Sequence, residues 1–283
     1  MQRLLVYQAI WGMENLPGVD MEGAMDQALS KIFDAGFDGV GVSLMRADRA
    51  EAVARGVRER GKSFEAIGFV RNRADLARWI DRAEELGAHH LNIQIMERPD
   101  RVSDAVALLT GFESEAARAS IPVHYETHRG RLTNDMLFTC RILEAMPTLR
   151  LTGDLSHYPL VHEMPLPVPE VDLVRISRVM RQCQAYHGRI PGSHQIQVSI
   201  KAPQHKGWVD QFRAWWREGF EDWIARSGPD AELTFMPELG PPHYAITGLD
   251  GQELSDRWEE AVMLKDMARE IWAALSAKPS ARA

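Results

Sequence analysis

The sequence of 283 residues predicts one α/β domain in which eight parallel strands close into a (β/α)8 TIM barrel. Short apolar runs alternate with segments of helical periodicity about eight times along the chain. This alternation is compatible with a closed barrel or with an open, doubly wound sheet. An open sheet that binds a dinucleotide would carry Gly-x-Gly-x-x-Gly after its first strand, but Ala9-Ile-Trp-Gly-Met-Glu14 stands there. The strand count and the missing motif favour the barrel.

The composition is that of an ordinary globular protein, with 45% hydrophobic and 26% charged residues. The net charge of −7 argues against a nucleic-acid partner, because duplex binding usually needs a basic surface. Cys140 and Cys183 are too few for a disulfide framework, which fits a reducing compartment. The sequence shows neither a signal peptide nor an apolar stretch of about 20 residues. We expect a cytoplasmic protein with no membrane partner, and the sequence leaves homo-oligomer formation open.

The first half of the chain contains four strand and helix pairs. We expect strands at residues 3–10, 37–44, 64–70 and 89–95. We expect helices at residues 21–35, 48–61, 73–86 and 104–119. Gly36, Gly61 and Gly87 stand where the first three helices should end, as glycine often does. Ser103 is the candidate N-cap of the fourth helix.

The second half repeats the pattern with two longer connections. We expect strands at residues 121–126, 149–154, 182–187 and 233–238. We expect helices at residues 136–146, 170–182, 208–225 and 253–275. The connections 155–169 and 188–206 are unusually long, which indicates a lid, a binding loop or a subunit contact. The barrel should therefore span residues 1–275, and residues 276–283 should form a flexible tail.

The four apolar runs of the second half end in polar residues, namely Glu126, Asp154, His187 and Glu238. The carboxyl ends of parallel barrel strands lie on one rim, so these side chains should converge. A lone carboxylate at a strand end is more often a cap or an ion-pair partner. Three carboxylates and an imidazole, however, would repel one another unless a divalent cation lay between them. The sequence therefore predicts one metal ion, and these ligands suit manganese, magnesium, cobalt or zinc.

Further residues flank this rim. His157 and Arg189 follow two of the strand ends closely and either bind a substrate oxygen or only brace a loop. His124 should point the same way as Glu126 but one layer lower, where it either binds substrate or is a buried histidine. Trp11 either stacks on a sugar or belongs to the core. Just beyond the fifth strand lie three residues that either bind a substrate carboxylate or are solvated, namely His128, Arg129 and Arg131.

The residues at and just after the four strand ends resemble those of a known protein family. Glu126, Asp-Leu-Ser-His at 154–157, His-Gly-Arg at 187–189 and Pro-Glu-Leu-Gly at 237–240 resemble the metal-site pattern of the xylose-isomerase-like TIM-barrel superfamily. That superfamily includes ketose 3-epimerases, hydroxypyruvate isomerases, inosose dehydratases and apurinic endonucleases of the endonuclease IV type. The resemblance implies that His157 and Arg189 touch substrate oxygens. It also implies the set of metal ligands Glu126, Asp154, His187 and Glu238, of which the two glutamates act as acid and base.

The activity implied by the resemblance is proton abstraction next to a carbonyl, through a metal-bound cis-enediolate. We expect a metal-dependent isomerase or epimerase of a small unphosphorylated sugar or keto-polyol, because no Gly-rich phosphate loop is present. The alternatives are a lyase or dehydratase acting on an inosose or 3-keto sugar, and a non-catalytic sugar-binding barrel. The endonuclease is disfavoured, because the expected second and third strands end without a histidine, and His89 and His90 open their strand rather than close it.

Overall fold

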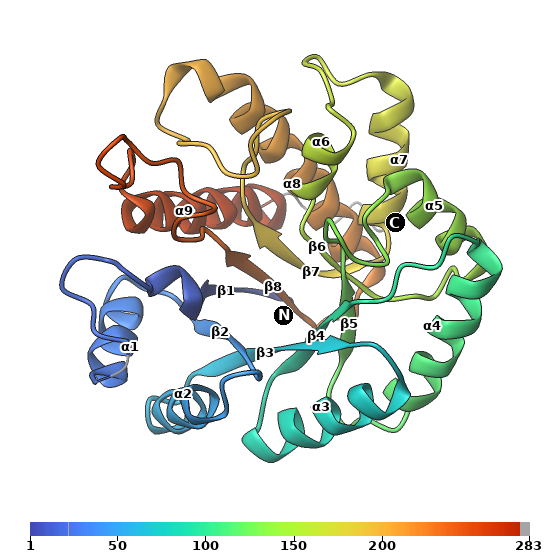
Figure 1. Ribbon diagram of the computed structural model, residues 1–283, viewed down its shortest axis with the longest axis horizontal. Helices are drawn as coiled ribbons and strands as arrows, with labels where there is room; N and C mark the ends of the chain where they lie inside the picture. The colour runs from blue at the N-terminus through green and yellow to red at the C-terminus, as the bar shows by residue number, and fades with distance from the viewer. Residues whose placement is uncertain (22, 278–283) are drawn as a thin grey trace.

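The computed structural model describes residues 1–21 and 23–277, and Figure 1 shows its strands at the centre of a ring of helices. Eight parallel strands pair in chain order from β1 to β8, and β8 pairs with β1. The sheet is therefore a closed barrel, and the predicted (β/α)8 architecture is confirmed.

The strands are β1 Arg3–Ala9, β2 Gly39–Ser43, β3 Ser63–Val70, β4 His90–Ile95, β5 Val123–Glu126, β6 Leu151–Gly153, β7 Cys183–Gly188 and β8 Glu232–Pro237. The helices are α1 Met25–Asp34, α2 Ala47–Glu59, α3 Arg73–Leu86, α4 Val102–Ala116, α5 Met136–Ala145, α6 His157–Val161, α7 Glu170–Met180, α8 Lys206–Arg226 and α9 Arg257–Ser276. Two short 3-10 helices are η1 Ile10–Met13 and η2 Pro203–His205. None of the described helices is long and apolar enough to cross a membrane.

Several helix starts differ from the prediction. The helix α8 begins at Lys206 and not at residue 208, and α9 begins at Arg257 and not at residue 253. The helix predicted from residue 21 includes residue 22, which lies outside the described residues, and α1 begins only at Met25. Before it, Asp20 closes a turn in which its Oδ1 accepts a hydrogen bond of 2.8 Å from the backbone N–H of Gly23. The prediction that Ser103 caps α4 is wrong, because the helix already begins at Val102, and Arg101 occupies the N-cap without a side-chain hydrogen bond.

The connections also differ in detail from the prediction. The connection 155–169 contains α6, a five-residue helix that the sequence did not predict. At the end of the chain, α9 continues through Ser276, the first residue of the predicted tail. The rest of that predicted tail, residues 278–283, lies outside the described residues. The division of the chain into a barrel and a tail stays a prediction.

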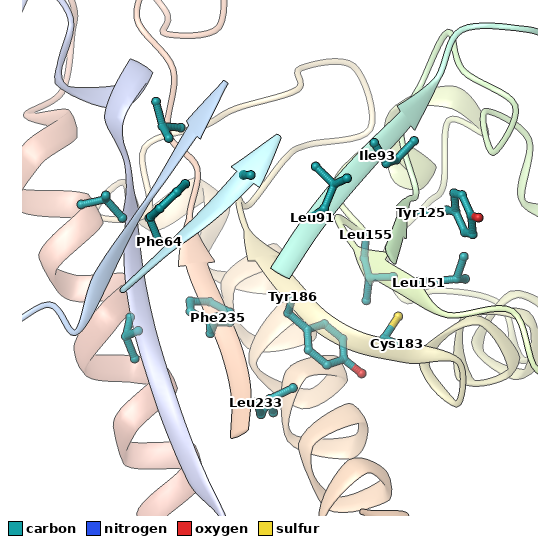
Figure 2. Packing of buried hydrophobic residues seen from close by; sticks show 14 of the residues in the cluster. Phe64, Leu91, Ile93, Tyr125, Leu151, Leu155, Cys183, Tyr186, Leu233 and Phe235 are labelled. Atoms are coloured by element: carbon teal, nitrogen blue, oxygen red, sulfur yellow. The ribbon is translucent and has the colours of Figure 1, made fainter. Parts of the chain in front are cut away.

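The apolar side chains form two clusters, because alternate residues of a strand face opposite sides of the sheet. The larger cluster lies between the strands and the helices, and Figure 2 shows Phe64, Leu91, Tyr125 and Phe235 within it. Burial of each such side chain contributes about 1.5–3 kcal/mol to folding. The smaller cluster consists of Tyr7, Ala9, Ile67 and Met236.

Polar side chains alternate with these outward residues on β3 and β4. Glu65 and Asn92 are both 0% exposed, and each stands between apolar neighbours that belong to the larger cluster. In the register of the two strands, Glu65 lies beside His90. Buried polar groups need hydrogen-bond partners. The partners of the buried polar residues of β3 and β4 include residues at the carboxyl end of the barrel.

Gly219 allows α8 to pack closely against β7. A Cβ at this position would overlap Oη of the fully buried Tyr186. We expect Gly219→Ala to lower the free energy of unfolding by about 1–3 kcal/mol through overpacking, although alanine usually stabilises a helix interior. The matched control is Gly111→Ala in α4, where the new Cβ would meet only the flexible side chain of Arg73. Urea unfolding measures both variants, and equal stability would contradict the prediction.

Candidate metal centre

Four residues converge at the carboxyl end of the barrel. Glu126 ends β5, Asp154 directly follows β6, His187 lies in β7 and Glu238 directly follows β8. Each residue offers one oxygen or nitrogen atom, and these atoms all lie within 4.8 Å of one another. All four residues are buried, and the most exposed of them is Glu238 at 6%. The structure thus brings together the residues predicted from the four strand ends, whose role as metal ligands stays a prediction.

His187 presents one ring nitrogen to the other members of this set. Its Nε2 lies 2.8 Å from Oε1 of Glu65, a carboxylate beneath the site. Its Nδ1 lies 3.3 Å from Oε2 of Glu238 and 3.9 Å from Oε2 of Glu126, yet it makes no hydrogen bond to any described residue. A metal-binding histidine typically donates its other N–H to a carboxylate, as the contact with Glu65 allows. The unpartnered Nδ1 therefore fits a cation bound among these carboxylates.

The electrostatics of the site favour a cation. Burial, together with the charges of Glu238 and Asp154, raises the pKa of Glu126 to about 8 against the opposing effect of His187. Burial alone would lower the pKa of His187, but Glu65 and Glu238 raise it well above its ordinary value. Both shifts arise because carboxylates are crowded in a buried place. A divalent cation would stabilise their ionised forms, so the donor set fits the predicted metal.

Arg189 lies inside the set and not on its open rim. Its Nη1 donates a hydrogen bond of 2.8 Å to Oδ2 of Asp154, and its Nη2 donates one of 2.7 Å to Oε2 of Glu238. Burial alone would raise the pKa of Asp154, but Arg189 and His157 hold it well below its usual range. The guanidinium fixes both carboxylates relative to each other. Oδ1 of Asp154 also accepts hydrogen bonds from the backbone N–H and the hydroxyl of Ser156, whereas Glu238 has further lone pairs with which to bind a cation.

His157 is fully buried beside Asp154. Its Nε2 lies 3.2 Å from Oδ2 of Asp154, and its Nδ1 accepts a hydrogen bond of 3.4 Å from Nη1 of Arg129. Burial lowers the pKa of His157, which keeps its imidazole neutral at neutral pH. His157 also forms a second group of potential ligands with Glu126 and His128. This group has one carboxylate where the set of four residues has three, so the set of four is the better cation site.

The two remaining predicted residues lie at different depths. The ring of Trp11, in η1, makes an edge contact at 5.2 Å with Tyr244, whose own ring covers the guanidinium of Arg189. Trp11 is therefore near the mouth of the barrel. His124 lies below Glu126, with its ring 5.0 Å from that of His90. The structure does not bring His124 to the mouth.

Asn92 and Gln94 position Glu126, and neither was predicted from the sequence. Nδ2 of Asn92 donates to Oε2 of Glu126 at 2.5 Å, and Nε2 of Gln94 donates to its Oε1 at 3.0 Å. Both residues are buried. The sequence signal was present, because polar residues stand at every second position of β4, which points them to one face of the strand.

Glu65 begins a chain of buried polar residues, and it was not predicted either. Its Oε2 lies 2.9 Å from Nε2 of His90, and Nδ1 of His90 lies 2.9 Å from Nδ1 of His89. Nε2 of His89 then lies 3.0 Å from Oε2 of Glu232, at the start of β8. The chain therefore connects His187 at the mouth with the amino end of the barrel. A charged residue amid the apolar residues of β3 was the signal for it.

Comparisons with known proteins identify the fold. No family model and no curated protein matches the sequence. A xylose isomerase-like TIM barrel protein from Mycobacterium smegmatis, solved in complex with magnesium, superposes with a TM-score of 0.60 at 13% identity and covers 96% of this chain and 97% of that one. An uncharacterized protein from Parabacteroides distasonis gives a TM-score of 0.51 at 11% identity over 96% and 98% of the two chains. This chain therefore shares the TIM-barrel fold of the Mycobacterium smegmatis protein over nearly its whole length.

Proposed function

We propose that this chain is a divalent-metal-dependent isomerase or epimerase of a small unphosphorylated sugar or keto-polyol. The observation that carries the proposal is the buried set of three carboxylates around the unpartnered Nδ1 of His187. The Mycobacterium smegmatis protein of the same fold was solved with magnesium, which supports a divalent ion here. Manganese, zinc and cobalt suit the same donor atoms.

In this proposal, Glu126 and Glu238 move the proton. A divalent cation, when bound, would polarise a substrate carbonyl and the neighbouring hydroxyl. Asn92 and Gln94 hold both oxygens of Glu126, and Arg189 holds Glu238 from another direction. Two carboxylates fixed by separate partners suit removal of a proton from a carbon next to the carbonyl and its return at the same or the adjacent carbon. Return to the same carbon gives epimerisation, and return to its neighbour gives isomerisation.

In this proposal, His157 and Arg189 bind the substrate oxygens. His157 is neutral and buried, and Arg189 is a fixed cation between two of the carboxylates. Hydrogen-bond donors that are fixed before the reaction stabilise negative charge that develops on a substrate oxygen. Burial of the whole set also keeps bulk water away from the reacting carbon.

Metal content of the purified protein tests the proposal. We expect about one divalent ion per chain in the wild type, and its loss in His187→Ala and Glu238→Gln, because each change removes a donor from a site of four. His194→Ala is the matched control, since His194 is exposed in the loop after β7. Elemental analysis gives the metal content, and thermal unfolding with added metal gives the gain in stability on binding. A wild type that neither contains metal nor gains stability from it would rule out the proposed mechanism.

A further inference from the structure

We propose that the substrate of this site carries a carboxylate, which Arg129 and Arg131 bind beside the metal ligands. The inference rests on the proposed function and narrows its substrates from neutral sugars to small sugar acids. Both arginines lie in the turn between β5 and α5, directly after Glu126.

This turn is held in one conformation. Oγ1 of Thr133 donates to the carbonyl of Glu126 at 2.6 Å and accepts from the backbone N–H of His128 at 3.0 Å. Between the two arginines, Gly130 has a φ of +69°, and its N–H donates to Oδ1 of Asn134 at 2.7 Å. The two guanidiniums therefore project from a rigid loop.

Arg129 extends over the site. Its Nη1 donates to Nδ1 of His157, whose opposite nitrogen contacts Asp154. Its Cζ lies 5.0 Å from the ring centre of Tyr244, and Cζ of Arg189 lies 4.9 Å from the same centre. One imidazole therefore separates the guanidinium of Arg129 from a predicted metal ligand. A substrate of a few carbons can span that distance.

Arg131 approaches from the other side of the turn. Its Nε donates to Oε1 of Gln94 at 2.9 Å, and Gln94 in turn holds Glu126. Its Cζ lies 5.8 Å from the ring centre of Phe69. Arg131 also forms part of the wall of a surface hollow of about 460 Å³, which two further arginines border, Arg98 and Arg141.

Neither guanidinium has an anionic partner within the part of the chain that the structure describes. Arg129 contacts an imidazole and a phenol ring, and Arg131 contacts an amide, a backbone carbonyl and a phenyl ring. In contrast, Arg189 pairs with two carboxylates. Arg189 and a divalent cation together balance the charges of the three ligand carboxylates. Arg129 and Arg131 are therefore two guanidiniums without a contacting carboxylate, and a planar carboxylate suits a guanidinium.

The surroundings favour a carboxylate over a phosphate. The amino end of α5 follows this turn in the chain, and phosphates often bind to such backbone N–H groups. Here Asp135 caps it, and its Oδ1 accepts a hydrogen bond of 2.7 Å from the backbone N–H of Phe138. Asp100 and Asp135 also line the hollow beside Arg131 and would repel a dianion more strongly than a monoanion.

Calorimetric titration of the metal-loaded protein with matched ligands tests the inference. The pairs are D-glucuronate with D-glucose and D-glycerate with glycerol, and inorganic phosphate is a separate arm. We expect each acid to bind at least about tenfold more tightly than its neutral counterpart, since a hydrogen bond to a charged group contributes about 1.5–3 kcal/mol. Arg129→Gln and Arg131→Gln should each weaken acid binding by about 10- to 100-fold and leave the metal content unchanged.

Matched variants distinguish the effect of losing a positive charge at the site from a general effect of substitution on folding. Arg213→Gln, on the outer face of α8 where Arg213 pairs with Glu270, should bind acids like the wild type. Arg129→Lys and Arg131→Lys should restore part of the affinity, because they keep the charge and lose the paired donors. Equal binding of acids and neutral sugars by the wild type would overturn the inference, as would tighter binding of phosphate than of both carboxylates. Metal content measured on the same samples shows separately whether the proposed function fails.

Discussion

Glu126→Gln is expected to reduce proton exchange at the carbon next to a substrate carbonyl by about 10²- to 10⁴-fold, because a glutamine side chain cannot accept the proton. Incorporation of deuterium from solvent into ketoses and keto acids, followed by NMR, measures this step whichever product the reaction forms. Exchange by the variant within a few-fold of the wild type would contradict the proposed role of Glu126 as acid or base.

The fold should survive this substitution. Glutamine has nearly the volume of glutamate, but its Nε2 would face the amide N–H of Asn92 or Gln94, which now donate to Glu126. Oδ1 of Asn92 has no partner among the described residues, so rotation of that amide would supply an acceptor. Glu144→Gln is the control, since Glu144 is exposed on α5 and pairs with Arg178, and the variant should exchange deuterium like the wild type.

The barrel was predictable because local signals agree along most of the chain. Both ends of α3 match the prediction, since Asn72 accepts a hydrogen bond from the N–H of Asp75 at its start, and Gly87 adopts a φ of +76° at its end. The short α6 was missed because a proline lies within it, further prolines follow it, and five residues leave no periodicity to detect. The start of α1 also differs from its predicted position, because a single turn precedes the helix and decides where it begins.

The convergence of Glu126, Asp154, His187 and Glu238 was predictable because strand ends share a rim whatever the register of the strands. Residues in the middle of the barrel depend on which strands face each other across it. Glu65 bonds to His187, which lies 122 positions later in the sequence. Strand alternation shows that Glu65 points inward, but it does not show which inward residue it meets. For the same reason the sequence placed Arg189 on the rim, although its guanidinium lies between Asp154 and Glu238.

Glu65→Gln is expected to weaken metal binding by about 10- to 100-fold, although Glu65 is not itself in the predicted ligand set. Glu65 lies between the imidazoles of His187 and His90, at 2.8 and 2.9 Å. Burial alone would raise the pKa of Glu65, but these two histidines lower it below its usual range, so the group is a carboxylate in the folded protein. As an acceptor it holds the proton of His187 on Nε2 and leaves Nδ1 free to bind a cation.

The carboxylate of Glu65 accepts hydrogen bonds from both imidazoles, but a glutamine side chain can accept with its oxygen and must donate with its NH2 group. The hydrogen bond that fixes His187 therefore becomes weaker, or its donor and acceptor exchange roles. We expect the free energy of unfolding to fall by about 1–3 kcal/mol as well, because a fully buried polar chain loses a partner. Glu232→Gln is the matched control, since Glu232 ends the same chain at the partly exposed amino end of β8 and contacts His89 and Arg3 instead. Titration with Mn²⁺ and urea unfolding of both variants measure the two effects. If Glu65→Gln lost stability but bound Mn²⁺ like the wild type, the chain would serve only the packing of the barrel, and the orientation of His187 would need another cause.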